Sequence, residues 1–137
     1  MRDDQRSTCP ISTALELVGD RWTLLVIRDL MFAGKRHFRE FLQSEEAISS
    51  NVLSDRLNAL VESAIVTRRD DPTHAQKAIY SLTEKGLSLL PVLIAMSAWS
   101  QKYEPGTRRA EAVALVARGP KSLRQLEAQL RRVHGIP

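Results

Sequence analysis

The spacing of apolar residues along the chain predicts a mainly helical fold with one small β-hairpin. The first helix should follow Cys9, because the proline that comes next loses no hydrogen bond at a first helical position. Residues 21–31 are apolar on most sides, so they should form the buried central helix, with Asp20 as its N-cap. A turn at residues 33–36 then leads to a short helix at about residues 38–42.

A longer helix is expected after this turn, and it combines an apolar face with a small polar face. Ser49 is a suitable N-cap, and the helix should run to about residue 63. Leu53, Leu57 and Leu60 recur at helical spacing and should face the core. The opposite face carries short polar and charged side chains.

Two segments with strand-like alternation follow this helix directly. Residues 65–69 and 77–82 are rich in Ile, Val, Thr and Tyr, and polar residues 70–76 join them, which predicts a β-hairpin with a long tip. Thr83 can cap the next helix, and Pro91 should bend it or end its first segment.

A short helix, a tight turn, a second helix and a ribbon form the order of a winged helix-turn-helix. The second helix would enter the DNA major groove, where short serine and asparagine side chains allow a close approach and both donate and accept hydrogen bonds. Cations on the ribbon would meet phosphates or enter the minor groove. The candidate DNA-binding residues are Arg36 before the motif, Ser49, Ser50, Asn51, Ser54, Asp55, Arg56 and Asn58 on the second helix, and Arg68, Arg69, His74 and Lys77 on the ribbon.

Several of these residues have a second interpretation. The polar helix face suits a solvated surface equally well on spacing alone, and the adjoining ribbon favours DNA. Asp55 suits either a cytosine amino group or the orientation of Arg56, and the second is favoured because a carboxylate near phosphates needs a partner. Arg56 suits a phosphate contact and a structural salt bridge equally. A charged hairpin tip also serves solubility alone.

Composition and charge limit the function without deciding it. The chain has 137 residues, enough for one domain, and a net charge of +4, which points only weakly to an anionic partner. Residues 101–137 carry 8 basic and 3 acidic groups and so contain the whole basic excess. No apolar run is long enough to span a bilayer, and the polar N-terminus lacks the apolar core of a signal peptide, so we expect a cytoplasmic protein without membrane contact.

The sequence assembles no recognisable catalytic or metal-binding group. His37, His74 and His134 lack metal-ligand spacing, and Asp29 replaces the first glycine that a phosphate loop would need before Gly34. We therefore expect no enzymatic activity, no metal and no cofactor. The single cysteine cannot form an internal disulfide; by base rate it is a small buried hydrophobe, and as a helix-terminal thiol near basic residues it is alternatively a reactive redox sensor.

Four short stretches carry a family pattern. They are Cys9-Pro10-Ile11, Gly19-Asp20-Arg21-Trp22, Leu53-Ser54-Asp55-Arg56-Leu57, and Tyr80-Ser81-Leu82-Thr83 followed by Gly86. Together they resemble the HxlR-type transcriptional regulators, bacterial winged-helix proteins related to the MarR group, over residues 9–99. The sequence departs from the family before the second wing strand, where residues 75–77 replace a proline-rich stretch and an arginine.

The resemblance implies a homodimer that binds an inverted-repeat operator, with residues 49–63 as the recognition helix. Dimer contacts would come from residues 10–18 and 83–99. In some members the cysteine at the position of Cys9 senses electrophiles or oxidants by thiol modification or an intersubunit disulfide. The expected function is therefore a transcriptional repressor whose partners are double-stranded DNA, a second copy of the chain, and a small-molecule or oxidant effector. A protein-interaction module without sequence-specific DNA binding is the alternative.

The expected organisation has three parts. Residues 1–8 form a polar tail, residues 9–104 the winged helix-turn-helix domain, and residues 105–137 a helical extension that lies beyond the family pattern. In the extension, a basic helix capped by Ser122 should follow the break at Gly119 and Pro120. A narrow apolar seam on this helix either covers the dimer core or binds a partner; it consists of Leu123, Leu126, Leu130 and Val133.

Overall fold

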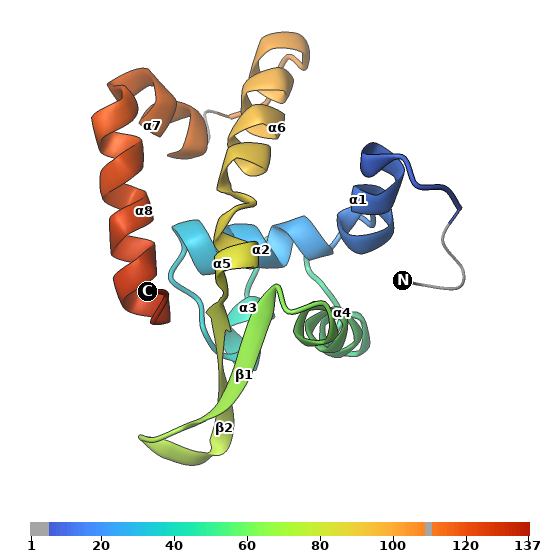
Figure 1. Cartoon of the computed structure of the whole chain (residues 1–137), viewed down its shortest axis with the longest axis vertical. Helices are drawn as coiled ribbons and strands as arrows, with labels where there is room; N and C mark the ends of the chain where they lie inside the picture. Colours follow the sequence, from blue (N-terminus) through green and yellow to red (C-terminus); the bar gives the residue numbers. More distant parts are fainter. Residues whose placement is uncertain (1–5, 109–110) are drawn as a thin grey trace.

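The computed structural model describes residues 6–108 and 111–137, without the side chains of residues 74–76 and 111. Its hairpin protrudes from one end of the molecule, α6 rises from the other end, and α7 and α8 fold back along one side (Figure 1). The predicted winged-helix fold, mainly α with one hairpin, is confirmed. The elements are α1 (Pro10–Val18), α2 (Thr23–Phe32), α3 (Phe38–Phe41), α4 (Ser50–Glu62), β1 (Val66–Asp71), β2 (His74–Leu82), α5 (Glu84–Leu87), α6 (Leu90–Tyr103), α7 (Glu111–Arg118) and α8 (Pro120–His134).

The core forms around α2, as its apolar character predicted. Ile27 and Leu30 of this helix are almost completely buried, and the leucines of α4 pack into the same cluster. Phe41 from α3 meets Tyr80 from β2 edge to face, with ring centroids 6.2 Å apart. Burial of each large apolar side chain stabilises the fold by about 1.5–3 kcal/mol, so α4 has a firmly determined position.

The junction between α1 and α2 differs slightly from the prediction. The N-cap position of α2 is Trp22, so the helix starts two residues later than expected. The carboxylate of Asp20 nevertheless accepts hydrogen bonds from the backbone N–H groups of Trp22 and Thr23, at 2.9 and 3.0 Å. Asp20 therefore still satisfies the free donors at the start of α2.

Side-chain caps begin the short and long helices of the helix-turn-helix. The Ser49 hydroxyl accepts from the Val52 N–H, as expected of an N-cap. At the start of α3, the Glu40 carboxylate accepts from the N–H groups of Arg36 and His37. Between the helices, Ala47 has a left-handed backbone, with φ of 60°, which makes the turn sharp.

The hairpin is longer than predicted and its tip is shorter. The strands pair antiparallel from Val66 opposite Leu82 to Asp71 opposite His74, with an irregularity between Asp70 and Asp71. The predicted tip of residues 70–76 was wrong because the Asp71 carboxylate accepts from the backbone N–H and hydroxyl of Thr73, at 2.8 and 2.6 Å. This local turn lets the chain reverse within two residues.

Helices α5 and α6 follow the predicted cap and break. Thr83 accepts from the Gly86 N–H, and Pro91 lies in the first turn of α6. Gly86 lies where α5 meets the start of the hairpin: a Cβ atom there would be 2.2 Å from the carbonyl oxygen of Ile65 and 3.1 Å from the Leu82 side chain. The glycine is thus required by close backbone approach.

The C-terminal extension packs on the core of the winged helix. Leu130 and Ile136 are buried in the main cluster, and the backbone N–H of Leu82 donates to Nδ1 of the buried His134 at 2.9 Å. Arg131 binds the Glu84 carboxylate through two nitrogens, at 2.6 and 2.7 Å. His134 at the end of α8 therefore supplies a partner for one backbone N–H on the outer edge of β2.

Two expectations for this extension need correction. Gly119, with φ of 101°, is the N-cap position of α8, so Ser122 lies inside the helix. The seam covers this chain's own core through Leu130 and partly through Leu123 and Leu126, whereas Val133 is 52% exposed. The reason is the direction of α8, which brings its last two turns against β2 and α5.

The Gly86 contact makes a specific stability prediction. Gly86→Ala should lower the free energy of unfolding by about 1–3 kcal/mol, because the added methyl group must displace backbone. Urea unfolding followed by circular dichroism measures this change. Gln125→Ala, on the exposed face of α8, is the control and should stay within about 0.5 kcal/mol of the wild type. Equal stability of the two variants would refute the close approach.

Candidate DNA-binding surface

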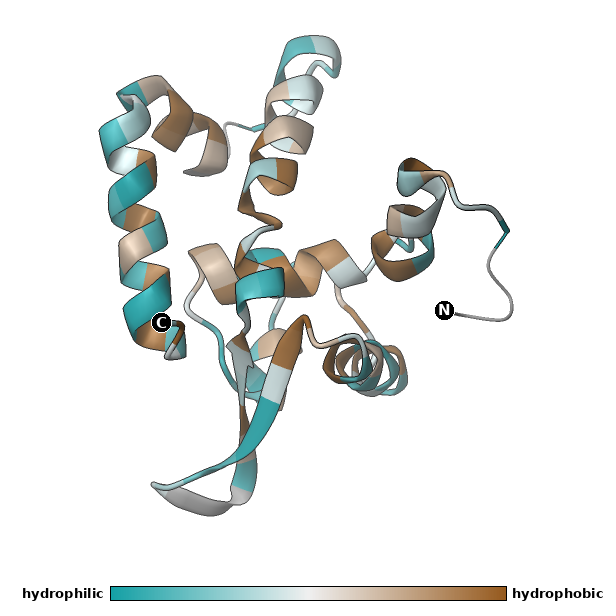
Figure 2. Ribbon diagram, viewed as in Figure 1, coloured by the Kyte–Doolittle hydropathy of each residue, from teal (hydrophilic) through white to brown (hydrophobic). Residues whose placement is uncertain are grey.

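The outer face of α4 is an open row of small polar side chains. The leucines on the buried side fix the rotation of the helix, so the polar residues must face solvent, and Figure 2 shows hydrophobic and hydrophilic residues on different sides of α4. Among the described residues, none of these side chains has a hydrogen-bond partner within the chain. The row consists of the exposed residues Ser50, Asn51, Ser54, Asp55 and Asn58, and we call it the polar ridge.

Arg56 lies beside the polar ridge and has a structural partner. Its Nε is 3.2 Å from Oδ2 of Asp20, so the pair joins α4 to the junction of α1 and α2. The carboxylate that orients Arg56 is therefore Asp20, and the expectation that Asp55 does so needs correction. Asp20 lies in the junction between α1 and α2, which packs beside α4 in the folded chain. The spacing of residues along α4 alone could not predict this contact.

Arg36 is held by the protein and does not face solvent as a free cation. Its guanidinium donates to the carbonyl oxygens of Tyr80 and Val133, at 2.7 and 3.3 Å, and to the hydroxyl of Ser81. Burial, together with the positive charge of Arg69, lowers the pKa of Arg36. Arg36 thus ties the turn before α3 to β2 and α8, so the expectation that it is a DNA contact gives way to a structural role.

Three cations of the wing are exposed. Arg68 and Arg69 lie on β1, opposite Tyr80 and Ile79, and Lys77 lies on β2. In the part of the chain that the structure describes, none of the three cations has an ion-pair partner. His74 belongs to β2, but its side chain lies outside the described set.

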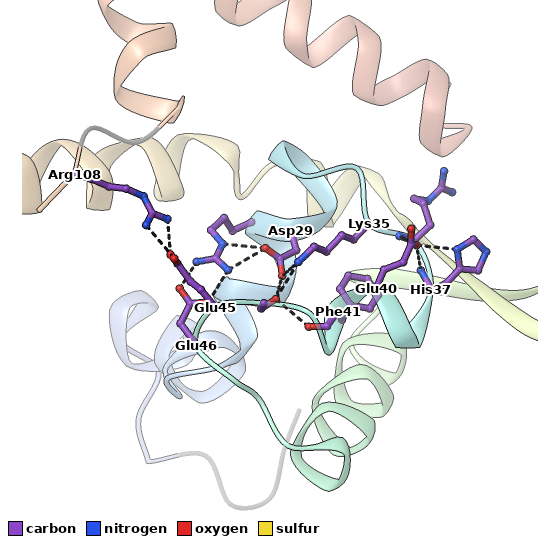
Figure 3. A network of polar contacts seen from close by, with 11 residues as sticks. Asp29, Lys35, His37, Glu40, Phe41, Glu45, Glu46 and Arg108 are labelled. Carbon is purple, nitrogen blue, oxygen red and sulfur yellow. Dashed lines mark hydrogen bonds and ion pairs between the residues drawn. The ribbon is translucent and has the colours of Figure 1, made fainter.

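A histidine that the sequence did not single out joins the wing to the helix-turn-helix. Nε2 of His37 is 2.7 Å from Oδ2 of Asp71. Nδ1 of the same ring is 2.8 Å from Glu40, a pair that Figure 3 shows. Hydrogen bonds to Asp71 and then to Glu40 raise the pKa of His37. Hydrogen bonds from the hydroxyl and backbone N–H of Thr73, and then from His37, lower the pKa of Asp71 to about 2. The spacing of His37 and Glu40 suits a capping box, but nothing local indicated the contact with Asp71.

Cys9 is exposed, contrary to its base-rate expectation as a buried hydrophobe. It is the N-cap residue of α1, whose first turn leaves backbone N–H groups free. Hydrogen bonds from the backbone of Ser12 and then of Ile11 lower the pKa of the thiol. The thiol is thus accessible, and its thiolate is stabilised by the helix terminus.

Two helices carry apolar side chains that nothing in the described chain covers. Helix α1 stands away from the core and has no buried residue (Figure 1); Ile11 is 73% exposed and Leu15 is 53% exposed. Helix α6 has an exposed stripe at helical spacing. The stripe consists of Val92, Met96, Trp99 and Tyr103.

Within residues 6–108 and 111–137, no three His, Cys, Asp or Glu side chains come together as a metal site. Over these residues there is also no helix with the length and apolar character needed to cross a membrane.

The His37 bridge predicts a specific pH dependence. Because the folded state raises the pKa of His37, its contribution to stability is complete below the ordinary value of 6.5 and is lost as the pH rises through the folded-state pKa. The wild type should therefore exceed His37→Gln in unfolding free energy at about pH 6, and by less at about pH 9. Urea unfolding of both proteins measures the difference. An equal difference at both pH values would contradict the charged bridge.

The sequence of the chain matches a family of known proteins. The family model for the HxlR-like helix-turn-helix matches residues 17–108. The transcriptional regulator YodB of Bacillus subtilis is 41% identical over 100 residues, which cover 72% of this chain and 88% of YodB.

Solved structures agree with this match. PA1607 superposes with a TM-score of 0.68 at 31% identity, covering 77% of this chain and 74% of PA1607. The redox regulator HypR in its oxidised form has a TM-score of 0.62 at 30% identity, covering 70% of this chain and 98% of HypR. With the winged fold, the polar ridge and a family match over most of its length, the chain belongs to the HxlR-like helix-turn-helix family of transcriptional regulators.

Proposed function

We propose that the protein is a sequence-specific repressor that binds an inverted-repeat operator as a homodimer. The observation that carries this proposal is the polar ridge of α4, which has no partner in the described chain and lies beside a protruding wing (Figure 1). A solvated surface helix needs no such neighbour. Occupation of an operator that overlaps a promoter excludes RNA polymerase, so repression is the simplest outcome.

The side chains divide the work of recognition. The Asn51 amide can donate and accept at once, as a bidentate contact with adenine requires, and the neighbouring serines add single hydrogen bonds. Arg68, Arg69 and Lys77 would bind phosphates and set the position of the duplex. Arg56 supports α4 from behind through Asp20, which leaves the ridge itself free for bases.

A homodimer accounts for the apolar surface. The exposed faces of α1 and α6 would cover each other across a two-fold axis, which removes large side chains such as Trp99 and Ile11 from water. The same axis would present two α4 helices to successive major grooves, about 34 Å apart. The alternative of a protein-interaction module loses its main support, because the apolar seam of α8 covers the chain's own core.

Substitutions on the ridge and on the wing should have different effects. Asn51→Ala should reduce discrimination between the operator and a mismatched operator by about 1–3 kcal/mol, because a base contact is lost. Arg69→Ala should weaken binding to all duplexes alike and lower the slope of log affinity against log salt by about one. Fluorescence anisotropy with operator DNA over a salt series measures both effects and gives the number of copies bound.

Arg124→Ala is the matched control for the lost charge, since Arg124 is exposed on α8, about 15 Å along the helix from the end that meets the wing. It should leave the salt slope unchanged. If Asn51→Ala keeps the sequence preference of the wild type, the polar ridge is not the recognition surface. If one copy of the chain binds the operator, the proposed dimer is wrong.

We also propose that Cys9 adjusts this binding in response to electrophiles. The proposal rests on the exposed thiol with its lowered pKa and on the relatives. YodB has been solved reduced, with quinone bound and after diamide treatment, and HypR reduced and oxidised. Addition of the thiolate to a quinone forms a C–S bond, and the ring takes up a proton to become a hydroquinone. With one cysteine in the chain, any disulfide joins two copies or binds a small thiol.

Cys9→Ser tests the sensor. Under reducing conditions the variant should bind operator DNA as tightly as the wild type, because Cys9 is the N-cap residue of α1 and does not belong to the polar ridge. Treatment with a benzoquinone or diamide should change operator affinity of the wild type only. Mass spectrometry locates the adduct. A variant that still responds would remove Cys9 as the sensor while leaving the DNA-binding proposal intact.

A further inference from the structure

A large groove lies where the chain after α6 comes close to α2. It is bounded by α2, α6, the start of α7 and the turn that joins α3 to α4, and its volume is about 830 Å³. This volume falls within the ~300–1,000 Å³ that is typical of small-molecule sites. Thr107, Arg108 and Ala112 close one wall, so the chain that follows α6 helps to build the groove.

The charges in the groove compensate one another. Arg28 binds Glu46 through two nitrogens, at 2.7 and 2.8 Å. Arg108 reaches across the groove to Glu45 (Figure 3), and Lys35 lies 3.4 Å from Asp29. Three cations thus meet three carboxylates, and the site offers a charged ligand no free counter-charge.

The rest of the lining is apolar, with a few free polar groups. Leu24, Phe32, Leu93 and Met96 supply apolar surface, and Met96 also belongs to the exposed stripe of α6, so the groove borders the face proposed for the dimer. Among the described residues, the side chains of Ser97 and Ser100 also line the groove and have no hydrogen-bond partner within the chain. These hydroxyls can orient a ligand that is otherwise held by apolar contact.

We propose that this groove binds an uncharged, mainly apolar small molecule with one or two hydrogen-bonding groups, and that the molecule regulates DNA binding. The proposal that the molecule regulates DNA binding rests on the proposed operator binding. The proposal that the groove binds the molecule does not depend on it. Cys9 does not line the groove, so this site is separate from the thiol.

The groove is connected to the recognition helix through its own wall. Glu45 and Glu46 belong to the turn that ends at Ser49, the N-cap of α4. The hydrogen bonds from Arg28 lower the pKa of Glu46 to about 2, which marks a strong pair, while the pair of Arg108 and Glu45 is largely exposed and easily broken. A ligand that separates Arg108 from Glu45 releases one restraint on this turn and so changes the presentation of the polar ridge.

The uncharged dye N-phenyl-1-naphthylamine, whose fluorescence rises in apolar surroundings, provides the test on the full-length dimer without DNA. The wild type should bind the dye saturably. Ser97→Trp, which places an indole in the groove, should weaken binding about tenfold or more. Gln125→Trp, on the outer face of α8, adds the same indole elsewhere and should bind like the wild type.

Sedimentation and operator titration complete the test. Ser97→Trp should remain a dimer that binds operator DNA. By linkage, saturating operator should change dye affinity by the same factor by which the dye changes operator affinity, up to about fivefold, the most that one exposed ion pair supplies. Absence of saturable dye binding, or dye binding untouched by Ser97→Trp, overturns the site. If Ser97→Trp becomes monomeric, a second copy of the chain occupies the groove. If the dye binds but leaves operator affinity unchanged, the groove does not regulate DNA binding.

Discussion

Burial of one face of α4 is the constraint on which the rest of the structure depends. Leu53, Leu57 and Leu60 are all almost fully buried beside the central helix, so α4 cannot rotate without exposing at least two of them. Each exposure would cost about 1.5–3 kcal/mol, which is a large part of the stability of a small domain. The direction of the polar ridge is therefore set by leucines that no ligand would touch. A helix fixed in this way can read a groove because its outer side chains have few other positions to adopt.

Several arginine side chains form contacts within the chain, so only the other cations remain free to bind an anionic partner. Arg36, Arg56 and Arg131 each join elements that are distant in sequence, and their partners are carbonyl groups or carboxylates of the same chain. Arg68 and Arg69 are exposed on the wing. The carboxylate of Asp71 near the wing tip binds Thr73 and His37. Net charge alone thus underestimates the local positive charge of the wing.

The features that the sequence predicted depend on near neighbours, and those that it missed depend on distant ones. Ser49 as a cap and Pro91 as a break follow from contacts within about four residues, where chain geometry leaves few alternatives. The contact of His37 with Asp71 spans 34 residues, and that of Leu82 with His134 spans 52. Their existence depends on how whole helices pack, which periodicity does not encode. The tip of the hairpin was misjudged for a related reason, because a side-chain turn at Asp71 replaced a loop that composition alone favoured.

The C-terminal extension makes the wing a supported element. A two-stranded ribbon is marginally stable alone, and its outer edge leaves backbone N–H groups unpaired. His134 fills one of these positions at Leu82, and it can accept that hydrogen bond only while Nδ1 is unprotonated; burial, and then the charge of Arg36, lower the pKa of His134 to about 4 and keep it neutral. The extension also supplies Arg108, which touches the turn before α4. The same segment therefore contacts the base of the wing at one end and the turn before α4 at the other, so a change in its position reaches both parts of the proposed DNA-binding surface together.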